Sequence, residues 1–195
     1  RTLKIEEITP RPASQSVRFT WNGEPVEAEL PLIGEFQTLN ALGAAALAIR
    51  SGVSPQTAFV ALERLAGVPG RLELAGKTNA DAPVLIDYAH TPDGLDKLLR
   101  AARPHTQGRV IVVFGAGGDR DPNKREKMGR VAAKLADHVI VTDDNPRSED
   151  PAAIRRAVLE GCPDAAEIAD RRAAIGEAVA MLREGDALLI AGKGH

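Results

Sequence analysis

The second part of the chain repeats one pattern: a short apolar run, a polar loop and then an amphipathic stretch. The apolar runs are PVLIDYA, RVIVVFGAGG, HVIVTDD, AAEIAD and DALLIAG, and helical patterns follow the first four, over 93–102, 124–136, 151–160 and 171–183. Short, continuously apolar strands that alternate with amphipathic helices are typical of a mostly parallel sheet covered on both faces. We therefore expect a doubly wound, Rossmann-like α/β fold over residues 71–195.

Residues 1–70 follow a different pattern. The stretch SVRFTWNGEPVEAEL alternates apolar and polar residues on both sides of Asn22-Gly23, which predicts an antiparallel hairpin, and LKIEEI is expected to add a third strand. Two helices should follow, FQTLNALGAAALAIRSG and then SPQTAFVALERLAG, with Ser54 as the N-cap and Pro55 in the first turn. We interpret residues 1–70 as the end of an α/β domain and GVPGRLE as the hinge to a second domain, residues 71–195.

Composition excludes several classes of protein. With 195 residues, 44% of them apolar, the chain can bury a sizeable core. Its 25 basic and 27 acidic residues give a net charge of -2, and aromatic residues make up 3%, so we expect no nucleic-acid partner. A single cysteine, Cys162, excludes an internal disulfide and is interpreted as buried filler. No apolar run approaches the ~20 residues that a membrane span needs.

Four loops should meet at one edge of the predicted sheet. They are DYAHTPD, GAGGDRDPNK, TDDNPRSED and GKGH, and each leaves the carboxyl end of an apolar run. In open α/β sheets, ligands bind outside the carboxyl ends of the strands. All four loops carry more charge than a turn requires, so we expect the binding site at this edge.

The first two loops offer a carboxylate and a guanidinium. In DYAHTPD, Asp87 could accept a hydrogen bond from a ribose hydroxyl, whereas Thr91 and the proline after it are explained by helix capping alone. In GAGGDRD, the glycines let the backbone approach a ligand, and Arg120 stands between Asp119 and Asp121, which should orient its fork toward a carboxylate. The basic residues that follow, Lys124, Arg125 and Lys127, are interpreted as the solvated start of a helix.

The third loop, TDDNPR, has two interpretations. Asp144 could receive an ammonium group and Arg147 a carboxylate, so that the loop would bind a zwitterion. Alternatively, Asn145 and the proline after it form an Asx turn ahead of a helix that starts at 148–151. Turn chemistry leaves Arg147 unexplained, which favours the binding site.

One stretch resembles a phosphate-binding loop without being one. GRLELAGKT has five residues instead of four between Gly70 and Gly76, and the NADAP that follows is a turn where a phosphate loop requires a helix. We therefore interpret Gly76 to Asn79 as the end of a hairpin.

The motifs LNALGAAALAI, GVPGRLE, DYAHTPDGL, FGAGGDRD, TDDNPR and GKGH, in this order, resemble the Mur ligase family over nearly the whole chain. The resemblance implies that residues 1–70 end the ATPase domain and that residues 71–195 receive an incoming amino acid. In this family the arginine of DNPR is typical of the members that add meso-diaminopimelate, which makes this amino acid the implied substrate. Three positions depart from the family pattern: Gln37, Thr91 and Glu126.

The resemblance also implies a role for individual residues. Those expected to line the diaminopimelate site are Arg120, Asp144, Asn145, Arg147 and Gly192, and those expected to face ATP are Asn40, Arg71, Asp87 and His90. No catalytic residue or metal ligand is expected in this chain, because the phosphate loop and the Mg²⁺ ligands would belong to the part of the enzyme before residue 1. On this interpretation the 195 residues bind one substrate and ligate nothing alone.

The implied activity is ATP-dependent amide formation in peptidoglycan precursor synthesis. Meso-diaminopimelate would be joined, through an acyl phosphate, to UDP-N-acetylmuramoyl-L-alanyl-D-glutamate by a monomeric cytoplasmic enzyme that uses ATP and Mg²⁺. Two alternatives stay open: another amino-acid ligase, either lysine-adding or similar to cyanophycin synthetase, and a non-catalytic Rossmann-like module that binds a metabolite.

Overall fold

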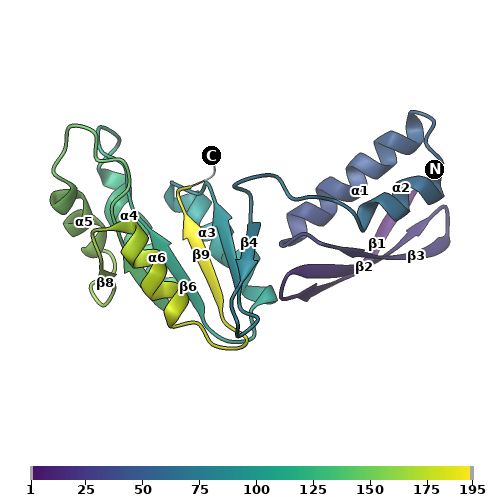
Figure 1. The fold of residues 1–195 in the computed structure, drawn as a ribbon. Helices are drawn as coiled ribbons and strands as arrows, with labels where there is room; N and C mark the ends of the chain where they lie inside the picture. Colours follow the sequence, from purple (N-terminus) through teal and green to yellow (C-terminus); the bar gives the residue numbers. More distant parts are fainter. Residues whose placement is uncertain (1, 194–195) are drawn as a thin grey trace.

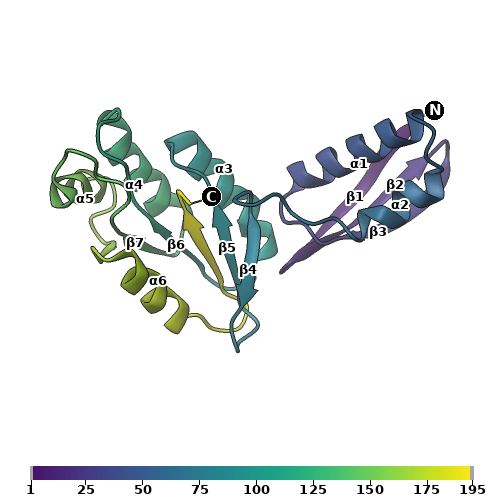
Figure 2. The same cartoon turned by 45° about the horizontal axis from the view of Figure 1, so that its top comes forward.

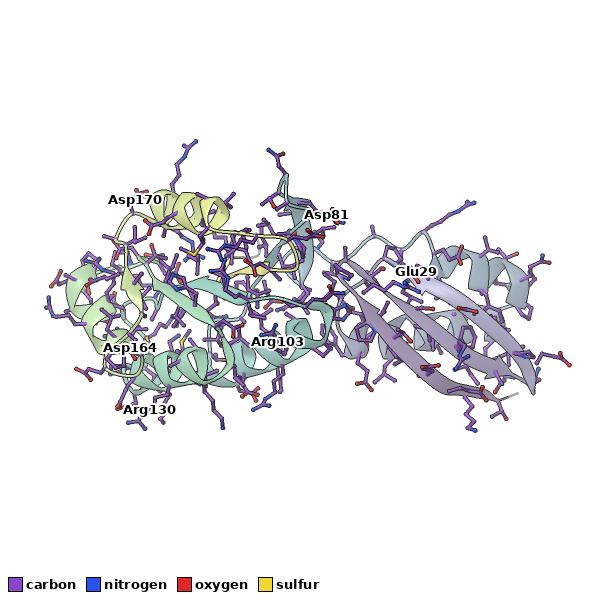
Figure 3. The ribbon with its side chains drawn as sticks, turned by 90° about the horizontal axis from the view of Figure 1, so that it is seen from below. Glu29, Asp81, Arg103, Arg130, Asp164 and Asp170 are labelled. Atoms are coloured by element: carbon purple, nitrogen blue, oxygen red, sulfur yellow. The ribbon has the colours of Figure 1, made fainter. Side chains whose placement is uncertain are left out.

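Two β-sheets, each with its own helices, form the molecule (Figure 1). The computed structural model describes residues 2–193, so Gly194 and His195 of the predicted GKGH loop lie outside the described residues. Figure 3, seen from below, places the sheets at opposite ends: Glu29 lies on the small sheet, and Asp164 and Asp170 lie at the far side of the large one. None of the described helices combines the length and apolar character that a bilayer crossing requires.

The small sheet is antiparallel, as the alternating pattern predicts. Its strands, in the order β1-β2-β3, are β1 (Leu3–Arg11), β2 (Ser14–Trp21) and β3 (Glu24–Leu30). Phe19 faces Val26 across the hairpin, and both turn residues, Asn22 and Gly23, have positive φ angles of 53° and 92°. Helices α1 (Glu35–Arg50) and α2 (Pro55–Leu62) complete this unit, and Ser54 caps α2 through the Thr57 amide. The hairpin, the third strand and both helices are thereby confirmed.

The large sheet has six strands and carries the loops of interest. In spatial order they are β4 (Glu73–Lys77), β5 (Pro83–Asp87), β9 (Ala187–Ala191), β6 (Val110–Phe114), β7 (His138–Val141) and β8 (Ala166–Glu167). Only β4 runs antiparallel to its neighbour, and the chain between β4 and β5 turns at Thr78 to Asp81. The phosphate-loop lookalike is therefore the end of a hairpin, as predicted.

Helices cover both faces of the large sheet (Figure 2). On one face lie α3 (Pro92–Ala102), α4 (Asn123–Leu135) and α5 (Pro151–Leu159), and on the other lies α6 (Arg171–Ala180). Strand β6 is fully buried. Val112 and Phe114 belong to the core under α3, α4 and α5, and Ile111 and Val113 belong to the core under α6. A strand buried on both faces must be continuously apolar, which explains VIVVF and confirms the doubly wound fold.

His105 joins the two units. It ends the short 3₁₀ helix η1 (Arg103–His105), where Nε2 accepts the Gly34 amide at 3.0 Å and Nδ1 lies 2.7 Å from the Arg11 carbonyl oxygen. An acceptor at Nε2 requires the neutral ring with its proton on Nδ1, so Nδ1–H donates to Arg11. Burial lowers the pKa of His105, which favours this neutral form.

Candidate functional site

A cavity of about 660 Å³ opens at the carboxyl ends of the parallel strands. It is lined by residues of all four predicted loops: Tyr88, His90 and Thr91; Gly117, Arg120, Asp121 and Lys124; Asp144, Asn145 and Arg147; and Gly192 and Lys193. The loops meet because β5, β9, β6 and β7 run parallel and end at the same edge. The structure thus brings together Arg120, Asp144, Asn145, Arg147 and Gly192, the five residues assigned to the amino-acid substrate.

The loops after β6 and β7 interlock through Gly118. Its amide donates to the Asn145 carbonyl oxygen at 2.9 Å, and its own carbonyl oxygen accepts a bond from Arg147 Nη1. A Cβ atom on Gly118 would lie 1.9 Å from the carbonyl oxygen of Pro146, so only glycine allows this contact. The glycine-rich sequence therefore lets one loop dock onto the other.

The turn interpretation of TDDNPR is confirmed, and Arg147, which that interpretation leaves unexplained, lies in the cavity wall. The Asn145 side chain accepts the Arg147 amide at 3.3 Å, which is an Asx turn, and the helix begins at Pro151 with Asp150 as its cap, within the predicted range 148–151. Arg147 has a φ of 50°, an uncommon backbone conformation for a side chain of this size. Its guanidinium lines the cavity, and its bond to Gly118 uses one of five N–H donors.

The expected orientation of Arg120 by its flanking acids is wrong. Asp119 accepts bonds from the Ser148 hydroxyl at 2.6 Å and the Ser148 amide at 3.3 Å, whereas Asp121 accepts from the amide and side chain of Asn123. Asp119 therefore holds the two loops to each other, whereas Asp121 bonds to Asn123, the first residue of α4. Arg120 is exposed at the cavity, where its guanidinium can turn toward a ligand.

The expectation that Lys124, Arg125 and Lys127 are all solvated at the start of α4 is wrong for two of them. Arg125 is 5% exposed and donates to Glu149 Oε1 at 2.7 Å, and this bond, together with one from the Asp119 amide, lowers the pKa of Glu149. Lys124 Nζ donates to the His90 carbonyl oxygen at 3.0 Å and lines the cavity, and burial lowers its pKa. Of the three basic residues, Lys127 alone is exposed.

The four residues predicted to face ATP do not share one cavity. Arg71 and Asp87 line a cavity of about 430 Å³ between α1 and α3, whereas His90 lines the larger one. Asn40 is exposed on α1, one turn from Phe36, which also lines the smaller cavity. Asp87 has structural partners as well: its two oxygens accept the Leu72 and Ala89 amides at 2.9 and 2.8 Å.

Tyr88 and Arg171 are further residues of this region. Arg71 lies over the Tyr88 ring at 5.5 Å, and Tyr88 packs edge-on against His90, with ring centroids 4.7 Å apart. Arg171 contacts the carbonyl oxygens of Asp143 and Ala191 behind the cavity wall. The sequence did contain a signal for Arg171, because this residue follows the predicted strand AAEIAD, which is β8 in the structure. The loop after that strand was not among the four considered.

Charge distinguishes this cavity from its neighbours. Its walls carry the cations Arg120, Lys124, Arg147 and Lys193 and the carboxylates Asp121 and Asp144. Such walls can bind a ligand that has several carboxylates and an ammonium group. A cavity of about 610 Å³ at the opposite edge is lined by the β4–β5 hairpin and α6, where Lys77 is already paired with Asp81. Across residues 2–193, no cluster of three or more His, Cys, Asp or Glu side chains could hold a metal ion.

Comparisons with known proteins agree on one family. The family model "Mur ligase, glutamate ligase domain" matches residues 70–194. Over 193 residues, 99% of this chain, the sequence is 59% identical to a UDP-N-acetylmuramoyl-L-alanyl-D-glutamate--2,6-diaminopimelate ligase from Mesorhizobium japonicum and 56% identical to one from Chelativorans sp. (strain BNC1). The chain spans about 40% of the length of these relatives.

Solved structures show the same relationship. A structure of a UDP-N-acetylmuramoyl-L-alanyl-D-glutamate--2,6-diaminopimelate ligase has a TM-score of 0.80 and 34% identity, with 99% of this chain and 40% of that chain covered. The UDP-N-acetylmuramate-alanine ligase of Thermotoga maritima has a TM-score of 0.73 and 26% identity, with 100% of this chain and 43% of that chain covered. With more than half of its residues matched by the family model, the chain belongs to the Mur ligase family.

Proposed function

We propose that this chain is part of an ATP-dependent ligase that joins meso-diaminopimelate to UDP-N-acetylmuramoyl-L-alanyl-D-glutamate during peptidoglycan precursor synthesis. Residues 71–195 would receive the diaminopimelate. The observation that carries the proposal is the convergence of Asp144, Asn145 and Arg147 with Arg120 and Gly192 on one cavity. Relatives 52–59% identical to this chain are named as ligases of this amino acid.

The chemistry of the cavity favours diaminopimelate over lysine. Diaminopimelate has an ammonium and a carboxylate at each end, whereas the side chain of lysine ends in an ammonium alone. Arg147 and Arg120 can each hold a carboxylate in two parallel hydrogen bonds, and Asp144 can accept from an ammonium. A receptor for a second carboxylate would be left unpaired by lysine, which makes it a strong discriminator.

The ATP side of the proposal rests on Arg71, Asp87, Asn40 and His90. The cavity beside Arg71 and Asp87 also contains the apolar ring of Phe36 and two cations, Lys97 and Arg100, which pair with Asp93 and Asp96 and would exchange these partners for the phosphates of a nucleotide. When bound, ATP supplies the phosphoryl group that activates the substrate carboxylate for attack by the amino group. In this proposal the Mg²⁺ ligands belong to the part of the enzyme before residue 1.

The division into two parts is also proposed. Residues 1–70 would end the ATPase domain, because a separate core formed by residues between Val17 and Leu62 supports an independent unit. The second part would begin near residue 71, which agrees with the start of the family match at residue 70. We further propose that the whole enzyme is a cytoplasmic monomer.

Ligation assays on the whole enzyme that carries this chain test the proposal. With meso-diaminopimelate and L-lysine as alternative substrates, we expect diaminopimelate to be strongly preferred. Arg147→Ala should raise the KM for diaminopimelate about 100-fold, as the loss of a charge-assisted fork implies. Arg130→Ala is the matched control, because Arg130 lies on the exposed face of α4 and pairs with Glu126. A wild-type preference for lysine, or equal KM values for Arg147→Ala and Arg130→Ala, would refute the proposed specificity.

A further inference from the structure

The geometry points to Arg171 as a positioning residue for the amino-acid site, an inference that rests on the proposed function. Arg171 is the first residue of α6, and its side chain is half-buried. Nη2 donates to the carbonyl oxygen of Ala191 at 2.7 Å, and Nη1 donates to that of Asp143 at 3.5 Å. These carbonyl groups belong to the peptide units that precede Gly192 and Asp144. One guanidinium therefore supports the backbone next to two of the residues that line the cavity.

Arg171 occupies a place where a cation is unfavourable unless it has specific partners. A positive charge in the first turn of a helix opposes the helix dipole, and burial of a charge costs free energy. Burial lowers the pKa of Arg171, and the nearby Asp144 carboxylate opposes that effect. The next residue, Arg172, is exposed. The two arginines therefore have the same charge and neighbouring positions but different surroundings.

The position of Arg171 matters because β7 and β9 are not neighbours in the sheet. Strand β6 lies between them, and its pairing with β9 ends at Ile190, one residue before Ala191. From Ala191 onward, β9 therefore has no pairing with β6. Arg171 spans the end of β6 and bonds to Ala191, the last residue of β9, and to Asp143, two residues beyond β7, where the loops enter the cavity.

The two bonds should contribute unequally. Asp143 has other partners, since its amide donates to the Ala169 carbonyl oxygen at 3.1 Å and its side chain pairs with Arg155. The bond to Ala191 is also shorter, and it holds the peptide before Gly192, whose φ of 81° is accessible mainly to glycine. Loss of Arg171 should therefore act mainly through the orientation of the peptide at Gly192.

The test compares three variants of the whole ligase that carries this chain. Arg171→Met keeps the length of the side chain without its donors, Arg171→Lys keeps a charge and one donor group, and Arg172→Met is the matched exposed control. Kinetics would give kcat and the KM values for the amino acid and for ATP, and thermal unfolding would give Tm. We expect Arg171→Met to raise the KM for the amino acid at least about tenfold, with the KM for ATP within about threefold. Arg171→Lys should be intermediate, and Arg172→Met should match the wild type.

Two results would overturn the positioning role. One is an amino-acid KM for Arg171→Met equal to that of Arg172→Met. The other is a parallel rise in both KM values with a fall in Tm, which would identify Arg171 as a general stabiliser of the fold; if Arg171→Met does not fold, Arg171→Lys is judged by the same criteria. The amino acid used is the one that the wild type ligates, so a lysine-specific wild type would refute the proposed substrate while the KM for lysine still tests Arg171.

Discussion

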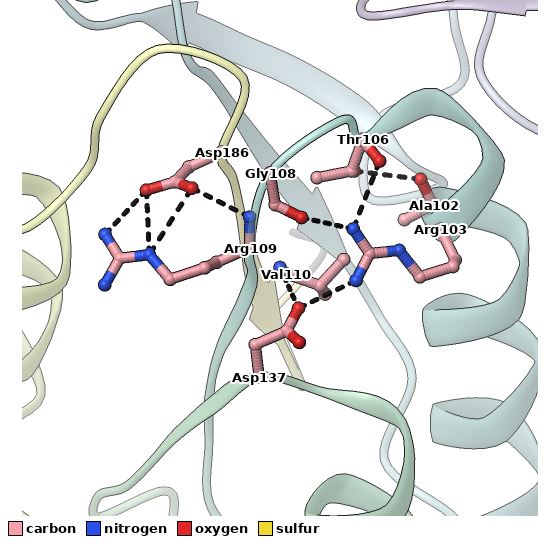
Figure 4. A network of polar contacts seen from close by, with 8 residues as sticks. All are labelled: Ala102, Arg103, Thr106, Gly108, Arg109, Val110, Asp137 and Asp186. Carbon is pink, nitrogen blue, oxygen red and sulfur yellow. Dashed lines mark hydrogen bonds and ion pairs between the residues drawn. The ribbon is translucent and has the colours of Figure 1, made fainter.

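The two edges of the large sheet use charged residues in opposite ways. At the amino edge, Asp186 accepts the Arg109 amide at 2.8 Å, Arg109 Nη2 at 2.6 Å and the Arg183 amide at 2.9 Å. Asp137 accepts the Val110 amide and Arg103 Nη1, both at 2.7 Å (Figure 4). These carboxylates fasten the start of β6 to the neighbouring loops.

At the carboxyl edge, charged side chains surround a cavity. Arg120, Asp144 and Arg147 line about 660 Å³ of space, and their positions depend on backbone contacts such as that between Gly118 and Asn145. Charges at the amino edge hold the protein together, whereas Arg120, Asp144 and Arg147 at the carboxyl edge line an open cavity. Substitutions at the first edge should therefore change stability, and substitutions at the second should change binding.

Gly118→Ala should have the largest effect on the carboxyl edge. The added Cβ atom would lie 1.9 Å from the Pro146 carbonyl oxygen, so the two interlocked loops must separate. Displacing binding groups by about 1 Å can cost roughly 100-fold in activity, and we expect a rise of that size in the KM for diaminopimelate. Overpacking should also lower the free energy of unfolding by about 1–3 kcal/mol.

The control for Gly118→Ala is Gly176→Ala, because a Cβ atom on Gly176 of α6 meets nothing within 4 Å. Alanine in a helix is about 1 kcal/mol more favourable than glycine, so the control should bind normally and be slightly more stable. Normal substrate binding by Gly118→Ala would mean that the loops do not depend on each other.

Asp186→Asn should produce the opposite pattern at the amino edge. The change removes the negative charge that four N–H donors of Arg109 and Arg183 surround, while Arg109, with 37% of its side chain exposed, can partly return to water. We expect the free energy of unfolding to fall by about 2–3 kcal/mol, below the cost of breaking a fully buried pair. Urea unfolding measures this loss, and the KM for diaminopimelate should stay within about twofold of the wild type. A large KM change with unchanged stability would contradict the comparison.

Acid should weaken the amino edge in the same way. Burial tends to raise the pKa of Asp186, but its bonds to Arg109 and Arg183 prevail and lower it from 3.8 to about 2. A carboxyl group with a lowered pKa in the folded state contributes stability above its unfolded pKa and loses it as the pH falls through the folded value. We therefore expect about 2 kcal/mol of stability to disappear between about pH 4 and pH 2. Unfolding followed across that range should show a smaller slope in Asp186→Asn than in the wild type.

The sequence predicted elements and the edge of the site better than individual contacts. Periodicity located the helices, and the parallel order placed the four loops together, because both depend on local pattern and general topology. The predictions that Asp119 orients Arg120 and that Arg125 is solvated were wrong. Each side chain instead bonds to a residue about 25–30 positions away, Asp119 to Ser148 and Arg125 to Glu149. Arg171 was missed although AAEIAD was recognised as a strand, because the loop after that strand was not among the four considered.

Native Cys162 tests the amino-edge side without any substitution, so this last experiment perturbs the protein least. The thiol is 2% exposed, which confirms its interpretation as buried filler, and burial raises its pKa from 9.0 to about 11. At pH 8 the thiolate fraction would then be roughly 100-fold lower than in the unfolded chain, since thiolate is the reactive form. Alkylation followed by mass spectrometry of the Cys162 peptide should therefore be at least about 100-fold slower in the native protein than in urea. Rapid native labelling would show that the region around α5 opens, and that the amino edge is less rigid than its ion pairs imply.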